Sequence, residues 1–144
     1  MTIIVSMVSV LVISLHFSWL ESGSERAVIR EADNFSRWVD GIFFKACLNK
    51  RAFQFIALPN STPVSKIYVK WAFNNTTETY DSKGRCYFTV RGHKVTQATY
   101  DPEWHMLSPG FTLKAVISKS KARAVRYIRI SPSCFVSVTV EPPR

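Results

Sequence analysis

Charged residues are missing from the start of this 144-residue sequence, because residues 1–20 contain no Lys, Arg, Asp or Glu. A helix rises ~1.5 Å per residue, so about twenty helical residues just cross a hydrocarbon core ~30 Å thick. Two parts of an ordinary secretory signal are also absent: no basic residue precedes the apolar run, and no small-x-small cleavage site follows it. The run therefore predicts either an uncleaved membrane anchor or a mature end left by a different processing enzyme.

Cysteine is scarce, and its spacing excludes the common metal motifs. The three cysteines, Cys47, Cys86 and Cys134, form no C-x-x-C pair. In a domain beyond the membrane, oxidising conditions would allow a disulfide. We expect it between Cys86 and Cys134, with Cys47 left as a buried thiol on a helix, although the sequence leaves the other pairings open.

Catalytic constellations are missing as well. His93 and His105 are the only histidines beyond the apolar run, and no nucleophile-elbow or active-site cysteine motif accompanies them. Asp101, Glu103 and His105 alternate, as metal ligands on one strand face would, but prolines within and after the segment indicate a polar loop. The sequence thus predicts a protein that is not an enzyme and that uses no metal or cofactor.

Acidic residues are absent between Glu103 and Glu141, in a chain with a net charge of +9 and a pI near 9.8. Such a basic stretch can attract nucleic acid, anionic lipid or an acidic partner. It can equally be a solvated strand edge that charge protects from aggregation. The candidate contacts to nucleic acid or another anion are Lys119, Lys121, Arg123 and Arg126.

After residue 24 the apolar residues recur at every third or fourth position, which predicts one stripe of an amphipathic helix. Basic residues near its end suit the negative end of the helix dipole, and we expect the helix to end near Leu48 or Lys50. Gly41 costs about 1 kcal/mol relative to alanine in mid-helix, which predicts close packing over it. The stripe consists of Val28, Ala32, Phe35, Val39, Ile42 and Ala46.

From Ala52 onward the pattern changes to short alternating segments separated by Pro, Gly and Asn, which predicts strands. The expected strands are 52–58, 66–73, 86–90, 93–100, 111–117, 123–130 and 134–140, with 86–90 and 93–100 paired as a hairpin. About seven strands and no further helix predict an α+β fold, in which an antiparallel sheet packs on the amphipathic half of the helix. We expect residues 1–24 to be a hydrophobic, transmembrane half of the helix and residues 25–144 to be a globular domain.

Four asparagines begin an N-x-S/T pattern, the acceptor for glycans in secreted proteins of eukaryotes and viruses. Their surroundings are poor for modification, since one lies on the helix, one sequon is followed by proline and two overlap. A signal-anchored, glycosylated surface protein of a eukaryote or virus therefore stands as an alternative of a different class. The four residues are Asn34, Asn60, Asn74 and Asn75.

Residues 1–8 read Met-Thr-Ile-Ile-Val-Ser-Met-Val, and residues 9–15 continue with small and aliphatic side chains. This resembles, in register, the mature N-termini of type IV pilins and type II secretion pseudopilins, which begin Phe/Met-Thr-Leu-Ile-Glu-Val-Met-Val. Their layout is also similar, with a long bipartite helix whose second half packs on an antiparallel β domain. The resemblance implies a pilin-like fold, close to that of minor pseudopilins, and a role as a structural subunit of a pilus or pseudopilus.

The resemblance also implies partners and a location. Subunits of this family wait in the bacterial inner membrane with a periplasmic domain, then join a periplasmic or extracellular filament through their N-terminal helices. The expected partners are therefore other pilin or pseudopilin subunits, and no cofactor is implied. Some minor pilins of the family bind DNA for uptake, which gives the basic stretch a further interpretation.

Met1, Thr2 and Val5 take the processing and assembly positions of the family, with Met1 as the methylated mature end. The family usually has glutamate at position 5, where the carboxylate is thought to neutralise the N-terminal amine of a neighbouring subunit. A lone carboxylate in hydrocarbon is costly unless it is paired. Val5 therefore indicates either another acceptor for the Met1 amine or a place where that contact is not made, such as a filament tip. Whether a leader was removed before Met1 stays open.

Overall fold

The computed structural model describes the backbone of residues 2–120 and 123–144 and, before residue 23, the side chain of Ser9 alone. Within these residues one helix is followed by nine strands, which confirms the α+β class. The elements are α1 (Thr2–Asn49), β1 (Phe53–Ile56), β2 (Lys66–Trp71), β3 (Thr77–Asp81), β4 (Tyr87–Arg91), β5 (Ala98–Asp101), β6 (Met106–Ser108), β7 (Phe111–Val116), β8 (Ala124–Ile130) and β9 (Val136–Thr139).

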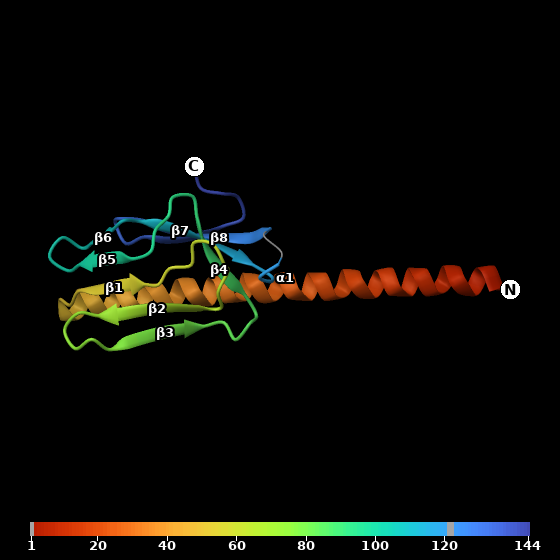
Figure 1. Cartoon of the computed structure of the whole chain (residues 1–144), viewed down its shortest axis with the longest axis horizontal. Coiled ribbons are helices and arrows are strands. Elements are labelled where there is room, and N and C mark those ends of the chain that lie inside the picture. Colours follow the sequence, from red (N-terminus) through yellow and green to blue (C-terminus); the bar gives the residue numbers. More distant parts are fainter. Residues whose placement is uncertain (1, 121–122) are drawn as a thin grey trace.

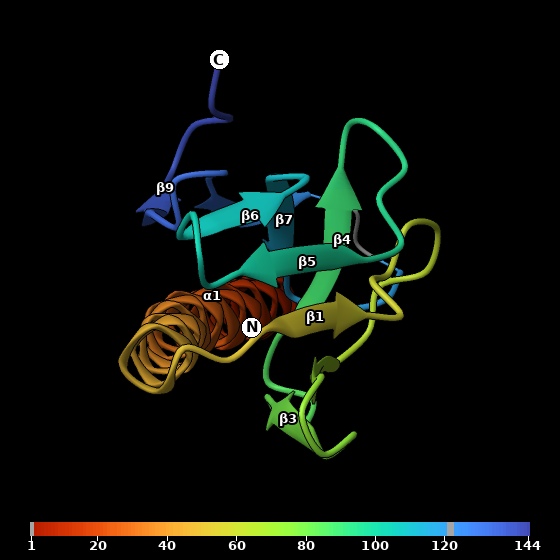
Figure 2. The same cartoon turned by 90° about the vertical axis from the view of Figure 1, so that its left-hand side faces the viewer.

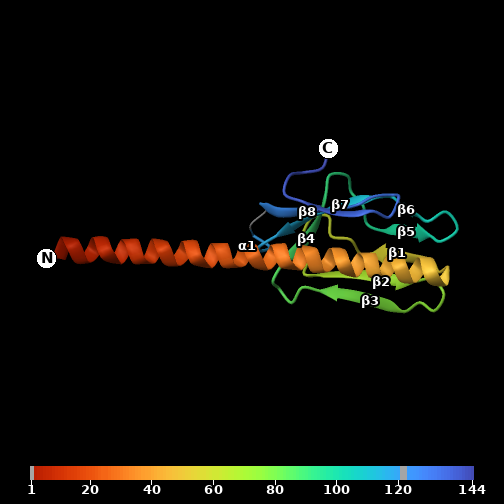
Figure 3. The ribbon, with the colours of Figure 1, turned by 180° about the vertical axis from the view of Figure 1, so that it is seen from behind.

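The helix α1 is a continuous stem of 48 residues. Its first part projects away from the strands, with the N-terminus at the far end, and its last part lies along them (Figures 1 and 3). The predicted apolar stripe is confirmed, since all six of its side chains are at most 2% exposed. The second half of the stem is thus one wall of the core.

The predicted end of the helix is also confirmed, because α1 ends at Asn49. The Arg51 N–H donates to the Ala46 carbonyl at 3.0 Å, and the Lys50 N–H donates to the Cys47 carbonyl at 3.4 Å. Together with a φ of 51° at Lys50, these bonds form a Schellman motif, which satisfies the last carbonyls of the helix. The chain then turns back, and β1 runs along α1 in the opposite direction (Figure 1).

The strands form two antiparallel sheets, one of order β3-β2-β1-β5-β6 and the other of order β4-β7-β8-β9. The prediction of about seven strands was short, because β3 and β6 fall in segments that turn signals marked as loops. The predicted hairpin of residues 86–90 and 93–100 was wrong: β4 belongs to the second sheet and β5 to the first. Figure 2 shows β4 running across the direction of β1 and β5, so the chain changes sheets at that point.

The core lies between the second half of α1 and both sheets. Phe35 is fully buried, and its ring lies 5.2 Å from that of Tyr80 on β3 and 5.0 Å from that of Phe88 on β4. Further along the helix, the Phe43 ring lies 5.6 Å from Phe53 on β1 and 5.7 Å from Tyr100 on β5. Aromatic side chains of the helix therefore join both sheets into one core.

Two expectations about the helix have different outcomes. The close packing predicted over Gly41 was wrong, because Gly41 is exposed and a Cβ added there would meet nothing within 4 Å. In the part of the chain that the structure describes, no helix is long and apolar enough to cross a membrane. The predicted transmembrane half, residues 1–24, consists largely of residues whose side chains the structure does not describe. Its division from a globular domain of residues 25–144 stays a prediction.

Candidate functional site

The projecting part of α1 carries the positions that the sequence assigned to processing and assembly. Met1 lies outside the described residues, whereas Thr2 and Val5 lie in the helical backbone of α1, with side chains that are not described. For Thr2 and Val5 the structure thus gives the helical backbone alone. Figure 3 shows that no strand accompanies this part of the stem.

Where the stem enters the domain, a buried carboxylate joins the helix to the strands. Glu31 is only 4% exposed, and it accepts a short hydrogen bond from the Tyr80 hydroxyl of β3. The Arg85 guanidinium, in the turn before β4, lies 3.4 Å from the other Glu31 oxygen. Burial, followed by the Glu31 hydrogen bond and charge, raises the pKa of Tyr80 well above its usual value. This Glu31 cluster (Glu31, Tyr80 and Arg85) fixes the stem where it leaves the domain.

The sequence reasoning missed the Glu31 cluster, although one signal was present. Glu31 is three residues after Val28 and four before Phe35, so it lies on the apolar stripe itself. A carboxylate on a buried helix face needs a donor from another element, because an unpaired buried charge is costly. The identity of the donors depends on tertiary structure, which the pattern does not give.

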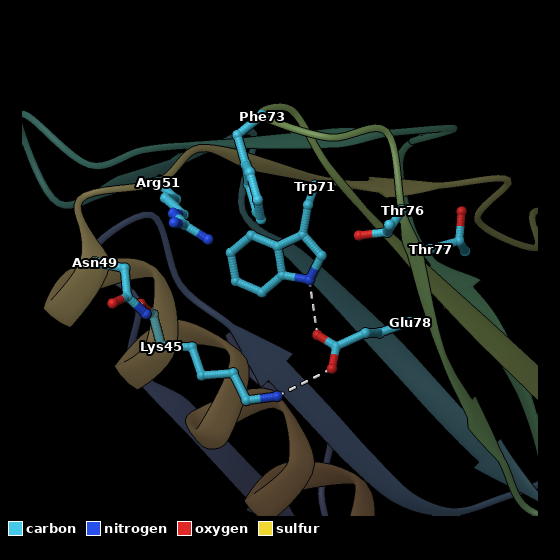
Figure 4. Close-up of a pocket in the computed structure, with 8 residues that line it drawn as sticks. All are labelled: Lys45, Asn49, Arg51, Trp71, Phe73, Thr76, Thr77 and Glu78. Atoms are coloured by element: carbon cyan, nitrogen blue, oxygen red, sulfur yellow. Dashed lines mark hydrogen bonds and ion pairs between the residues drawn. The ribbon is translucent and has the colours of Figure 1, made fainter.

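A cavity of about 260 Å³ lies at the opposite end of the domain, between the end of α1 and the β2–β3 turn (Figure 4). Glu78 accepts from the Trp71 indole N–H at 2.7 Å and pairs with the Lys45 ammonium at 3.0 Å. The Arg51 guanidinium carbon lies 3.8 Å from the centre of the Phe73 ring. The cavity is lined by Lys45, Asn49, Arg51, Trp71, Phe73, Thr76, Thr77 and Glu78.

Two of the charged groups that line this cavity, Lys45 and Glu78, are paired with one another. Partial burial alone would raise the pKa of Glu78, but the hydrogen bonds from Lys45 and Trp71 and the Lys45 charge lower it overall. Within the described residues, no group of three His, Cys, Asp or Glu side chains could hold a metal ion. The pairing of Lys45 with Glu78 therefore serves to tie the helix to β3, in the same way as the Glu31 cluster does at the other end.

Of the predicted anion-binding residues, the structure describes Lys119, Arg123 and Arg126. Lys121 lies outside the described residues, and Arg123 is exposed in the segment before β8. Arg126 pairs with the buried Ala115, so it lies on the core side of β8. The Lys119 ammonium instead lies 5.9 Å from the centre of the Tyr87 ring. Lys119 and Arg123 therefore lie exposed in the segment between β7 and β8, whereas Arg126 lies on the core side of a strand.

A different set of cations does share the outer face of the second sheet. Arg91, Thr112 and Arg129 occupy one cross-strand row over β4, β7 and β8, and Lys114 lies two residues beyond Thr112 on β7. The Arg91 guanidinium carbon of β4 lies 5.5 Å from the centre of the Tyr127 ring of β8, so these two side chains meet over β7. We call Arg91, Lys114 and Arg129 the outer basic face. This face depends on the register of the strands, which the count of charges in the sequence does not give.

All three cysteines are free thiols in this structure. Cys86 precedes the pair Tyr87–Val116, whereas Cys134 follows β8, which ends with Ile130 paired to Phe111. The two ends of β7 are about 17 Å apart at ~3.3 Å per residue, too far for a disulfide. The structure therefore does not bring Cys86 and Cys134 together, and Cys47, predicted to be buried, is exposed because it lies beside the stripe.

Comparison with protein-family models, curated proteins and solved structures finds no match to this chain. The structure itself defines the class: a two-sheet α+β domain carried on the second half of one long helix. Three features remain available for interaction with other molecules. They are the projecting half of α1, the outer basic face and the exposed residues around the end of the helix.

Proposed function

We propose that this chain is a structural, non-enzymatic subunit of a filament of the type IV pilus or type II secretion pseudopilus kind. The observation that carries the proposal is the division of α1, whose second half packs on the domain while its first half projects alone (Figure 1). The order of residues in the first half, Met-Thr-Ile-Ile-Val-Ser-Met-Val, supports the same family. The assembling part would be the projecting half.

The charge-free run explains why such a helix needs partners. Burying apolar surface is favourable by roughly 25 cal/mol per Å², and residues 1–20 carry apolar side chains on every side of the helix. Hydrocarbon would cover them before assembly, as in a single-pass inner-membrane protein with a periplasmic domain. Neighbouring stems would cover them in the filament. Val5 in place of glutamate suits a subunit near a filament tip, where no preceding amine has to be neutralised.

The test separates folding from assembly. A chain beginning at Glu25 is expected to be soluble, monomeric and β-rich by circular dichroism, because the buried stripe and both sheets lie beyond that residue. The full chain is expected to partition into membranes and to enter filaments when produced with a pilus or pseudopilus machinery. An unfolded product from the short chain, or filaments built from it, would contradict the proposal.

A point substitution gives a sharper version of this test. Leu11→Asp places a charge in the middle of the apolar run, at a cost of about 2.5–3.5 kcal/mol in a bilayer, and should abolish membrane retention and filament entry. Arg37→Asp is the matched control, since Arg37 is exposed on the packed half of the same helix. Equal behaviour of the two variants would show that the apolar run is not the assembling element.

A second candidate function is binding of DNA by the outer basic face. The observation that favours it is the placement of Arg91, Lys114 and Arg129 on one face of a sheet, with Lys114 and Arg129 in the stretch from 104 to 140 that has no acid. Phosphate contacts by a flat sheet would be independent of base sequence, because no reading helix is presented to a groove. Such a subunit would combine filament assembly with DNA capture.

Two triple variants test this candidate. Changing Arg91, Lys114 and Arg129 to Gln should weaken DNA binding. The slope of log K against log salt concentration should also become shallower, by about 0.7–0.9 for each phosphate that is no longer neutralised. Changing Lys119, Arg123 and Arg126 to Gln is the control that removes the same amount of charge. An anisotropy titration at low and moderate salt compares them. Equal weakening in both variants would leave only net charge as the cause and would overturn the candidate.

The glycosylated surface protein is a weaker alternative. The Asn60 side-chain nitrogen donates to the carbonyls of Leu58 and Val95, and its oxygen accepts from the Val95 N–H. A glycan on that nitrogen would disrupt this bridge between two loops. The Asn74 oxygen likewise accepts from the Thr76 N–H and hydroxyl, which fixes the turn before β3.

A further inference from the structure

The end of α1 and the turn between β8 and β9 meet at a small polar group beside the core. The Phe43 ring of α1 lies 5.7 Å from the Tyr100 ring, and the Tyr100 hydroxyl is hydrogen-bonded to the His105 Nδ1 at 2.8 Å. The Cys134 thiol, in the β8–β9 turn, donates to the His105 carbonyl at 3.6 Å. Cys47 lies one helical turn after Phe43 on the same side of α1. The two cysteines therefore approach Tyr100 and His105 from different elements.

Electrostatics supports the same proximity. Burial raises the pKa of Cys134 to about 11, and the charge of Cys47 contributes to that rise. Burial raises the pKa of Tyr100 to about 12, and the charges of Cys47 and Cys134 both contribute. Since such effects weaken with separation, both contributions agree with the position of Cys47 one helical turn after Phe43. Figure 2 shows β9 on the same side of the domain as the end of α1, and these two elements are in contact.

The backbone holds both cysteines in place. Cys134 has a φ of 65°, in a turn where its N–H donates to the Ser131 carbonyl at 3.0 Å. Glycine or asparagine is the usual choice at such a position, so local conformation does not explain a cysteine there. Cys47 lies in the last turn of α1, where its carbonyl accepts from the Lys50 N–H as part of the Schellman motif. The backbone positions of both cysteines are thus fixed by hydrogen bonds.

We propose that Cys47 and Cys134 form a disulfide under oxidising conditions, which clips the end of α1 to the β8–β9 turn. The bond closes a loop from residue 47 to residue 134 and so holds the helix against the second sheet. Cys86 takes no part, because it is buried at the other end of that sheet. The inference is independent of the proposed filament function.

The bond would form by exchange with a low-molecular-weight or protein disulfide, written RSSR. The exposed Cys47 thiolate attacks one sulfur of RSSR, which forms a mixed disulfide and releases RS⁻. Cys134 then loses its proton, and its thiolate attacks the Cys47 sulfur and releases the second RS⁻. The two cysteines lose two electrons and two protons in total, and RSSR is reduced to two RSH.

The experiment uses the full chain in detergent, incubated with oxidised glutathione and then alkylated under denaturing, non-reducing conditions. Peptide mapping is expected to show a Cys47–Cys134 cross-link and Cys86 as the single alkylated thiol. Thermal unfolding of the oxidised chain is expected to shift down by roughly 10 °C when dithiothreitol is added. Cys47→Ser and Cys134→Ser should each remove the cross-link and this shift, whereas Cys86→Ala should keep both.

Three results would overturn the proposal. Alkylation of all three thiols after incubation would show that no bond forms. A cross-link containing Cys86, or one joining two chains through the exposed Cys47, would show a different pairing. A shift on reduction that persists in Cys134→Ser would show that the effect of dithiothreitol has another cause.

Discussion

The two halves of α1 cover their apolar side chains in different ways. In the second half the apolar residues recur every third or fourth position, and the chain's own two sheets bury them. In the first half residues 1–20 contain no charged residue, and no strand lies beside the backbone of residues 2–20 (Figures 1 and 3). The partner of the second half is therefore encoded in the same chain, whereas the proposed filament would supply the partner of the first half.

The packed half also carries apolar residues that its own domain does not cover. Phe44 and Leu48 lie off the stripe, one helical turn apart, and are 68% and 70% exposed. In a filament of parallel stems, this side of the packed half would continue the apolar surface of the projecting half. The two halves would then share one exposed apolar side. Substitutions on the buried and the exposed side of α1 can measure what each side contributes to stability and to filament entry.

The largest expected effect comes from the stripe itself. Phe35→Ala in the chain beginning at Glu25 should lower the free energy of unfolding by about 3–5 kcal/mol, because it removes a fully buried ring from contact with both sheets. Urea denaturation followed by circular dichroism measures the decrease.

Phe44→Ala is the matched control for that substitution, since it removes the same ring from the exposed side. It should change the stability of the short chain by no more than about 0.5 kcal/mol, while reducing filament entry of the full chain. A comparable decrease of stability in both variants would show that the helix has no single packed face.

The helix was predictable because its signals are local. The stripe from Val28 to Ala46 and the end of the helix follow from spacing and composition alone, and both are confirmed. The strands were predictable where alternation is clear, as in β2, which places Ile67, Val69 and Trp71 in the core. The class of fold therefore follows from periodicity.

Features that depend on pairing between distant segments were not predictable. β3 has no strongly apolar face, and it is held mainly by its pairing with β2 and by Tyr80 and Glu78, which contact the helix. The division into two sheets, the outer basic face and the proximity of Cys47 to Cys134 all depend on register or crossover. A single sequence gives the faces of each strand but not which strands are neighbours.

A smaller effect, of opposite sign, is expected at Gly41. The residue lies on the exposed side of the packed half, and a Cβ there has open space around it. Gly41→Ala should therefore raise the free energy of unfolding of the short chain by about 0.5–1 kcal/mol through helix propensity and reduced freedom of the unfolded chain. Gly84→Ala is the control, because a φ of 75° should make the same change destabilising. Lower stability in Gly41→Ala would mean that this side of α1 is packed after all.

The smallest effect concerns the pair that ties the packed half to β3. The pKa of Glu78 is lowered in the folded protein, so the unfolded chain binds more protons near the ordinary glutamate value of 4.5. The stabilisation by Glu78 is therefore present above that pH and disappears as the pH falls through the folded-state value. Because Glu78 and Lys45 are partly exposed, it should amount to about 0.5 kcal/mol. The urea midpoint of the short chain should consequently change less between pH 6.5 and pH 3.5 in Glu78→Gln than in the parent. Glu103→Gln is the control, because Glu103 is an exposed carboxylate in the β5–β6 turn, and this variant should keep the parent's change. An unchanged difference in Glu78→Gln would show that the ion pair at the end of α1 contributes no pH-dependent stability.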